Sequence, residues 1–219
     1  MRAKIKPEDF PIYKEQLKNV MIDGLLYYVR DGIHPQFDRR AFLDCYNIVQ
    51  KFANRDDTSE LLFKYHNEVI EQAATECYEK TKGLSGFEFI DAFITYTERL
   101  NFLILNMEKI FEFLSVFYLT YAKDKKSLSE FSMDIYKKSF FDKLQTQVFT
   151  LLKELINNVP NNENIGLKIK SIMTIINYLD FVKPKIVKNS KNLGEWVETS
   201  EMPNNNPNTY QKMWNAFKG

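Results

Sequence analysis

Two histidines and two cysteines are the residues of this chain with the widest chemical use, and their spacing gives no catalytic or metal-binding set. His34 precedes a proline and is expected in a loop. His66 lies in a predicted helix beside Tyr65, where a lone histidine is far more often a surface or partly buried residue than a catalyst. A tetrahedral zinc site needs more ligands than His34, His66, Cys45 and Cys77 supply at standard spacing. We therefore expect no metal ion and no cofactor.

The two cysteines are expected to be inert thiols. Cys45 falls on the apolar side of a predicted helix, where a thiol behaves as a small hydrophobic group. Cys77 lies between Glu76 and Tyr78, and a neighbouring carboxylate raises the pKa of a thiol rather than activating it. Nothing in the sequence indicates a secreted, disulfide-linked domain.

The short motifs that accompany common enzyme chemistries are missing from the sequence. It contains no glycine-rich phosphate loop, no GxSxG, no HExxH and no CxxC. The acidic pairs Glu8-Asp9 and Asp56-Asp57 flank predicted loops and helix starts, where a favourable interaction with helix N-termini explains them. The basic run 123–126 reads as a solvated loop rather than a phosphate site. We therefore expect no enzymatic activity.

Composition favours a helical protein that meets neither nucleic acid nor membrane. Of the 219 residues, 44% are hydrophobic and 15% aromatic, with only 7 Gly and 7 Pro, which suits long helices better than turn-rich sheets. The net charge of +1 gives no field that would attract nucleic acid or an anionic membrane. The apolar stretch 102–121 is interrupted by charges, and Met1–Asp9 is polar, so neither a membrane span nor a signal peptide is predicted. We expect an intracellular protein, cytoplasmic and/or nuclear.

Apolar residues recur at steps of three and four along most of the chain, which predicts an all-α fold. The segment 87–121 is predicted as one long helix or as two with a bend near Asn101, and 54–59 as a loop. Asp38 and Ser127 are predicted helix caps, the latter in a capping box with Glu130. The remaining predicted helices cover about 11–29, 38–53, 60–81, 128–155 and 165–181.

The same periodicity predicts which side chains face the core. In the first helix one face carries Tyr13, Leu17, Val20, Gly24 and Tyr28. In the second helix the apolar side carries Phe42, Cys45, Val49 and Phe52, and in the third Leu62, Tyr65, Val69 and Ala73.

Taken in order, these segments resemble the N-terminal helical repeats of cullins, the scaffolds of ubiquitin ligases. Phe42–Val49 resembles the second helix of the first cullin repeat, with an aromatic residue, an acidic residue and a Tyr followed three positions later by a β-branched residue. Leu61–Tyr78 is similar to the next helix, and Tyr96–Leu119 to the long helix that closes that repeat. Segments 140–156 and 164–179 resemble the first two helices of the second repeat.

The resemblance covers about residues 8–182 and implies an elongated stack of long antiparallel helices, about one and a half to two five-helix repeats. The first repeat would span about 8–122, and the second would start near 127. An irregular linker is expected at 183–209 and a short amphipathic helix at 210–219. The layout is closest to the short family members that hold a single cullin domain and associate with a cyclin-dependent kinase. The adaptor-binding end of a longer cullin stays open as an alternative.

In cullins the adaptor docks on the outer faces of the second helix and of the long closing helix. The positions that match in this chain are Phe42, Leu43, Tyr46, Gln50, Glu112, Ser115 and Val116. Phe42 also lies on the predicted apolar side, and Leu43 and Tyr46 could instead pack on a neighbouring helix. The resemblance thus implies a non-enzymatic scaffold that binds a protein partner, either a Skp1-like or BTB-type adaptor or a cyclin-dependent kinase. A helical-repeat subunit of a tethering or coat complex is the alternative, and the oligomeric state is left open.

Overall fold

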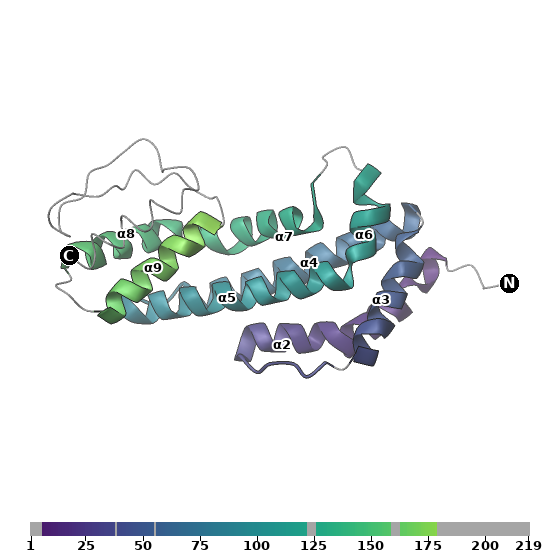
Figure 1. Ribbon diagram of the computed structural model, residues 1–219, viewed down its shortest axis with the longest axis horizontal. Helices are drawn as coiled ribbons and strands as arrows, with labels where there is room; N and C mark the ends of the chain where they lie inside the picture. Colours follow the sequence, from purple (N-terminus) through teal and green to yellow (C-terminus); the bar gives the residue numbers. More distant parts are fainter. Residues whose placement is uncertain (1–5, 38, 55, 122–125, 159–162, 179–219) are drawn as a thin grey trace. The chain divides into compact units, whose positions relative to one another are not determined.

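The computed structural model describes residues 6–37, 39–54, 56–121, 126–158 and 163–178, and all regular structure in these ranges is helical (Figure 1). The predicted all-α class is confirmed for them. The predicted cap Asp38, the linker 183–209 and the terminal helix 210–219 lie outside the described residues. The α-helices are α1 (Phe10–Leu17), α2 (Asp23–Asp31), α3 (Arg39–Ala53), α4 (Asp56–Thr81), α5 (Gly86–Ile110), α6 (Glu112–Phe117), α7 (Leu128–Tyr136), α8 (Asp142–Asn158) and α9 (Glu163–Tyr178).

The chain divides into two compact units. The first unit comprises residues 1–83 and 95–143, and holds α1 to α4, the later turns of α5, α6 and α7. The second unit comprises residues 84–94 and 144–219, and holds the start of α5, most of α8 and α9. Since α5 belongs to both units, its first turns are described with the second unit and its later turns with the first.

Two five-residue π turns share a sequence pattern. The first, Lys18–Ile22, joins α1 to α2, and the second, Lys137–Phe141, joins α7 to α8. Each begins with lysine, ends on two buried apolar residues and is followed by an aspartate, Asp23 or Asp142. In the first turn Lys18 Nζ lies 3.4 Å from an Asp23 carboxylate oxygen. The two turns are a local repeat that the sequence periodicity did not reveal.

The first π turn changes which residues of this helix are buried. The predicted face holds as far as Leu17, but after the turn the buried positions are Met21, Leu25 and Val29 rather than the predicted Val20, Gly24 and Tyr28. A π turn contains one residue more than an α turn, so every later side chain is displaced by one position around the axis. The prediction was wrong beyond Leu17 because it assumed one period throughout.

Two helix boundaries also differ from the prediction. Helix α4 starts at Asp56, inside the predicted loop 54–59, and its first turn is held to α3 by Thr58 Oγ1, which donates to the Phe52 carbonyl at 2.6 Å. The segment 87–121 divides at Phe111, not near Asn101. Phe111 has φ −97° and ψ 17°, and its carbonyl accepts a tight-turn hydrogen bond from Leu114 N at 2.8 Å. This break lets α6 leave the axis of α5.

The predicted capping box of α7 is confirmed. Ser127 Oγ accepts from Glu130 N at 3.2 Å, and a carboxylate oxygen of Glu130 accepts from Ser127 N at 2.6 Å. These two bonds satisfy backbone donors that the helix start would leave unpaired. The same bonds lower the pKa of the Glu130 carboxyl, because they favour its charged form.

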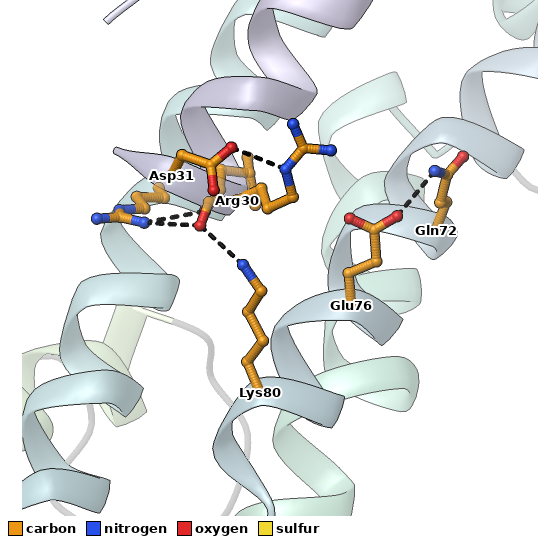
Figure 2. A network of polar contacts seen from close by, with 7 residues as sticks. Arg30, Asp31, Gln72, Glu76 and Lys80 are labelled. Atoms are coloured by element: carbon orange, nitrogen blue, oxygen red, sulfur yellow. Dashed lines mark hydrogen bonds and ion pairs between the residues drawn. The ribbon is translucent and has the colours of Figure 1, made fainter. Parts of the chain in front are cut away.

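The C-terminus of α2 is closed by two cations from other helices (Figure 2). The Arg30 carbonyl accepts from Lys80 Nζ at 2.9 Å, and Arg99 donates to the carbonyls of Val29 and Arg30 at 3.2 and 3.4 Å. Positive charge is favourable at this end of a helix. Gly32, at φ 78°, completes the turn by donating its N–H to the Tyr28 carbonyl at 2.8 Å. Lys80 on α4 and Arg99 on α5 therefore fix where α2 ends.

The second unit is assembled around the first turns of α5. Phe89 and Phe93 are buried there and stack with ring centroids 6.2 Å apart. Lys168 of α9 pairs with Asp91 at 2.5 Å and lies over the Phe87 ring at 5.2 Å. On α8, Gln147 Nε2 donates to the carbonyl of Leu84 at 2.8 Å. Polar contacts of α8 and α9 thus add to the apolar packing of this unit.

Candidate docking surface on α3 and α6

Helix α3 buries one side and exposes another, as its sequence predicts. Its buried side chains are Cys45, Ile48, Val49, Phe52 and Ala53. Phe52 contacts two aromatic rings of α1 edge-on, with centroid distances of 5.6 Å to Phe10 and 5.0 Å to Tyr13. This packing anchors α3 on the first unit and leaves its other side free to meet α6.

Four aromatic side chains form a continuous row across α3 and α6. Phe42 stacks on Tyr46 with centroids 6.1 Å apart, Tyr46 meets Phe113 at 4.6 Å, and Phe113 stacks on Phe117 at 5.7 Å. Phe42, Tyr46 and Phe113 are half-buried, and Phe117 is 42% exposed. This aromatic row (Phe42, Tyr46, Phe113, Phe117) therefore presents ring surface to solvent while its other side packs against the fold.

The two groups of predicted site residues lie on two helices that pack on each other. Phe42, Leu43, Tyr46 and Gln50 belong to α3, and Glu112, Ser115 and Val116 belong to α6. Tyr46 and Phe113 form a ring contact between the two helices. Leu43 and Val116 are 45% and 52% exposed, Gln50 and Glu112 are exposed, and Ser115 is half-buried. The surface therefore combines exposed aliphatic groups, half-buried rings and a polar margin.

Sequence reasoning missed two members of the aromatic row. The adaptor-binding positions predicted on this helix, Glu112, Ser115 and Val116, include neither Phe113 nor Phe117. The break at Phe111 redirects α6, so Phe117 reaches solvent although it follows the α5 periodicity. The signal present in the sequence, aromatic residues four positions apart, is equally typical of a core.

His66 is fully buried, which corrects the expectation of a surface or partly buried position. Its Nδ1 lies 3.1 Å from Asn67 Oδ1 and its Nε2 lies 3.4 Å from Ser132 Oγ. The order serine, histidine, amide matches a hydrolytic triad, but Ser132 is itself buried and donates to the Leu128 carbonyl at 2.9 Å. Since His66 and Ser132 are both excluded from solvent, the group is a polar link inside the first unit.

The other chemically capable side chains also lie in unreactive settings. Burial raises the pKa of the Cys45 thiol to about 11 and that of Cys77 to about 12, with smaller contributions from Asp44 and Glu76. The predicted effect of the neighbouring acid on Cys77 has the right sign, but burial is the larger cause. His34 is exposed; its ring is tilted against that of Tyr28 at 4.3 Å and meets Phe102 edge-on at 5.5 Å between centroids.

Within the described residues, no three or more His, Cys, Asp or Glu side chains gather closely enough to hold a metal ion. No helix in these ranges is both long and apolar enough to cross a membrane. Compared with known protein families, with curated proteins and with solved structures, the chain matches none.

Proposed function

We propose that this chain is a non-enzymatic protein-interaction scaffold of the cullin N-terminal type. It binds a Skp1-like or BTB-type adaptor, or a cyclin-dependent kinase, on α3 and α6. The observation that carries this proposal is the aromatic row, formed by helices far apart in the sequence at the places where the resemblance puts an adaptor site. Half-buried aromatic rings at the centre of an apolar surface are typical anchors of protein interfaces.

The lengths of the helices favour this proposal over a tethering or coat subunit. A uniform stack of hairpins has helices of similar length, whereas here α4 and α5 have 26 and 25 residues, α3 has 15 and α6 only 6. The paired π turns add support, since each begins about ten residues after the predicted start of a repeat, near 8 and near 127.

The chemistry of the surface suits helix-face docking rather than catalysis. Leu43, Val116 and the exposed edge of Phe117 supply apolar area whose removal from water drives association. Gln50 and Glu112 supply a polar margin that fixes the register of a partner. The side chains that could perform chemistry, His66, Cys45 and Cys77, are all buried away from this surface.

The test measures binding of purified proteins to the immobilised chain by biolayer interferometry at physiological salt. The partners are a Skp1-like adaptor, a BTB-type protein and a cyclin-dependent kinase. We expect at least one to bind, and Leu43→Asp or Val116→Asp to weaken it by roughly tenfold or more, since each places a charge in an apolar contact. The matched control Ile33→Asp changes an apolar side chain that is 56% exposed but lies outside α3 and α6.

Circular dichroism of all variants should be unchanged, because the substituted side chains are exposed. Absence of binding by all three partner classes contradicts the proposal. So does a partner whose affinity is lowered as much by Ile33→Asp as by Leu43→Asp, because such a partner does not use α3 and α6.

A further inference from the structure

The first turn of α3 carries two exposed arginines, Arg39 and Arg40, and no acidic residue. The N-terminus of a helix has a partial positive charge, so cations there oppose the helix dipole and carboxylates favour it. The arrangement is the reverse of α6 and α7, whose first turns carry Glu112 and Glu130. The two arginines therefore reduce the stability of α3 where they stand.

Neither guanidinium has a hydrogen bond or ion pair with another residue that the structure describes. Other surface lysines of the first unit do: Lys14 pairs with Glu68 at 3.1 Å and Lys18 with Asp23 at 3.4 Å. Arg39 and Arg40 thus combine an unfavourable position with the absence of a compensating carboxylate among the described residues.

The two arginines border the candidate docking surface. Leu43 follows Arg39 by four residues and Arg40 by three, and on a helix such neighbours lie on the same side. Tyr46 and Gln50 continue the line of Arg39 at seven and eleven residues, which are whole numbers of helical turns to within about 20° of arc. The surface therefore has a basic end (Arg39, Arg40) next to its apolar centre.

The ring spacing along the aromatic row fits one kind of occupant. Successive centroids are 6.1, 4.6 and 5.7 Å apart. Turns of an α-helix repeat about every 5.4 Å, so apolar side chains at steps of three and four on a docked helix would meet successive rings.

We propose that the occupant is an amphipathic helix of a protein partner whose apolar side covers the aromatic row and whose carboxylates pair with Arg39 and Arg40. This proposal rests on the proposed function and names the partner chemistry of the same surface. Guanidinium groups bind carboxylates through two parallel hydrogen bonds, which supply orientation as well as affinity. Pairing would also neutralise the charges that oppose the dipole of α3.

The acidic residues nearby do not argue for a basic occupant. Glu112 stands in the first turn of α6, where the helix dipole stabilises it without a partner. Asp44, exposed beside Leu43, carries one negative charge, whereas Arg39 and Arg40, four and five residues before it, carry two positive charges. Among the described residues of α3 from Arg39 to Asp44, the charge is therefore positive.

The test is a display selection of 16-residue amphipathic helical peptides on the whole chain. Apolar positions are Leu, Ile, Phe or Met, and the positions flanking the apolar side at one end are Glu, Gln or Lys. On the wild-type chain we expect Glu over Lys at the flank by roughly tenfold, as for two charge-assisted pairs. On the double variant Arg39→Glu, Arg40→Glu the preference should reverse.

The control Lys64→Glu, Lys138→Glu makes the same change of charge, from +1 to −3, at two exposed lysines of α4 and of the second π turn. It should keep the wild-type preference for Glu. The melting temperature of the arginine double variant should not fall, because glutamates suit the first turn of a helix. A second measurement needs no variant: affinity for a selected Glu-flanked peptide should drop when salt rises from about 0.05 to about 0.5 M.

Equal Glu and Lys frequencies on the wild-type chain would overturn this proposal and leave the docking surface intact, as would a salt-independent affinity. A lowered melting temperature of the arginine double variant would also overturn it, because the arginines would then serve the fold. Peptides that bind Leu43→Asp as well as wild type, or the absence of any enriched peptide, would count against the proposed function itself.

Discussion

The imidazole of His66 and the hydroxyl of Ser132 meet inside the first unit, with Nε2 and Oγ 3.4 Å apart and both residues excluded from solvent. His66 also meets the Phe111 ring edge-on, at 5.4 Å between centroids. Three helical elements, α4, α7 and the start of α6, therefore converge on one neutral side chain. Its burial lowers the pKa of the imidazole from 6.5 to about 4.

This burial makes stability depend on pH. Between pH 6.5 and 4 the unfolded chain binds a proton at His66 that the folded chain does not, so the free energy of unfolding falls as pH falls through that window. The expected loss from this residue is about 2–3 kcal/mol at pH 4.5 relative to pH 8. Urea unfolding at both pH values measures it. His66→Gln removes the titration, so the variant should lose less stability between the two values than the wild-type chain; equal losses would contradict the assignment.

Replacement of Gly32 by alanine should destabilise the chain by about 1–3 kcal/mol. The residue has φ 78°, and an added Cβ would approach the Arg99 guanidinium to 2.8 Å from Cζ, displacing the group that donates to Val29. Thermal unfolding gives the measurement. Gly83→Ala is the matched control, because a Cβ at Gly83 meets nothing within 4 Å. A cost at Gly83 as large as at Gly32 would show that glycine loss alone, not this contact, sets the effect.

Ser127→Ala should lower the free energy of unfolding by about 1 kcal/mol, because it removes the acceptor for Glu130 N at the start of α7. Ser127→Asp keeps an acceptor and should retain most of the stability. Chemical denaturation of the three proteins decides the matter. An alanine variant as stable as the wild type would mean that solvent satisfies the helix start equally well.

Two phenylalanines, Phe52 of α3 and Phe117 of α6, should respond very differently to truncation. Phe52 is fully buried between Phe10 and Tyr13, so Phe52→Ala should cost about 3–5 kcal/mol through lost burial and the cavity left behind. Phe117→Ala should cost less than about 1.5 kcal/mol, since that ring is 42% exposed. Urea midpoints with an unchanged m-value test both. Similar costs at the two positions would place Phe117 in the core and remove it from the docking surface.

Much of the fold follows from patterns that are local in sequence. Steps of three and four gave the helical class, and the serine–glutamate pair gave the start of α7. The boundaries that failed depend on packing. The break at Phe111 has no glycine or proline to announce it, and both Phe111 and Leu114, the residues joined by the turn, are buried in the fold. The early start of α4 depends on a contact between Thr58 and α3 that no single segment encodes.

The resemblance identified the candidate site, but helical periodicity could not predict which of its side chains are exposed or which rings contact one another. The amphipathic pattern of α3 placed Phe42 with the core residues, whereas its ring is half-buried and stacks on Tyr46. The role of Phe113 could not be predicted, because it depends on the packing of α6 beside α3. His66 was misjudged for a related reason, since a polar residue enters a core when Asn67 and Ser132 supply partners for its nitrogens.

At each of the two π turns the fold depends on the number of residues in the turn, although the sequence periodicity does not mark these places. Deleting one residue from Lys18–Ile22 would restore an uninterrupted α-helix and rotate Leu25 and Val29 about 100° toward water. This would follow even if the deleted residue were Val20, whose own side chain is exposed. Insertions and deletions, usually tolerated in surface loops, would here turn the apolar side of the helix that follows away from the core.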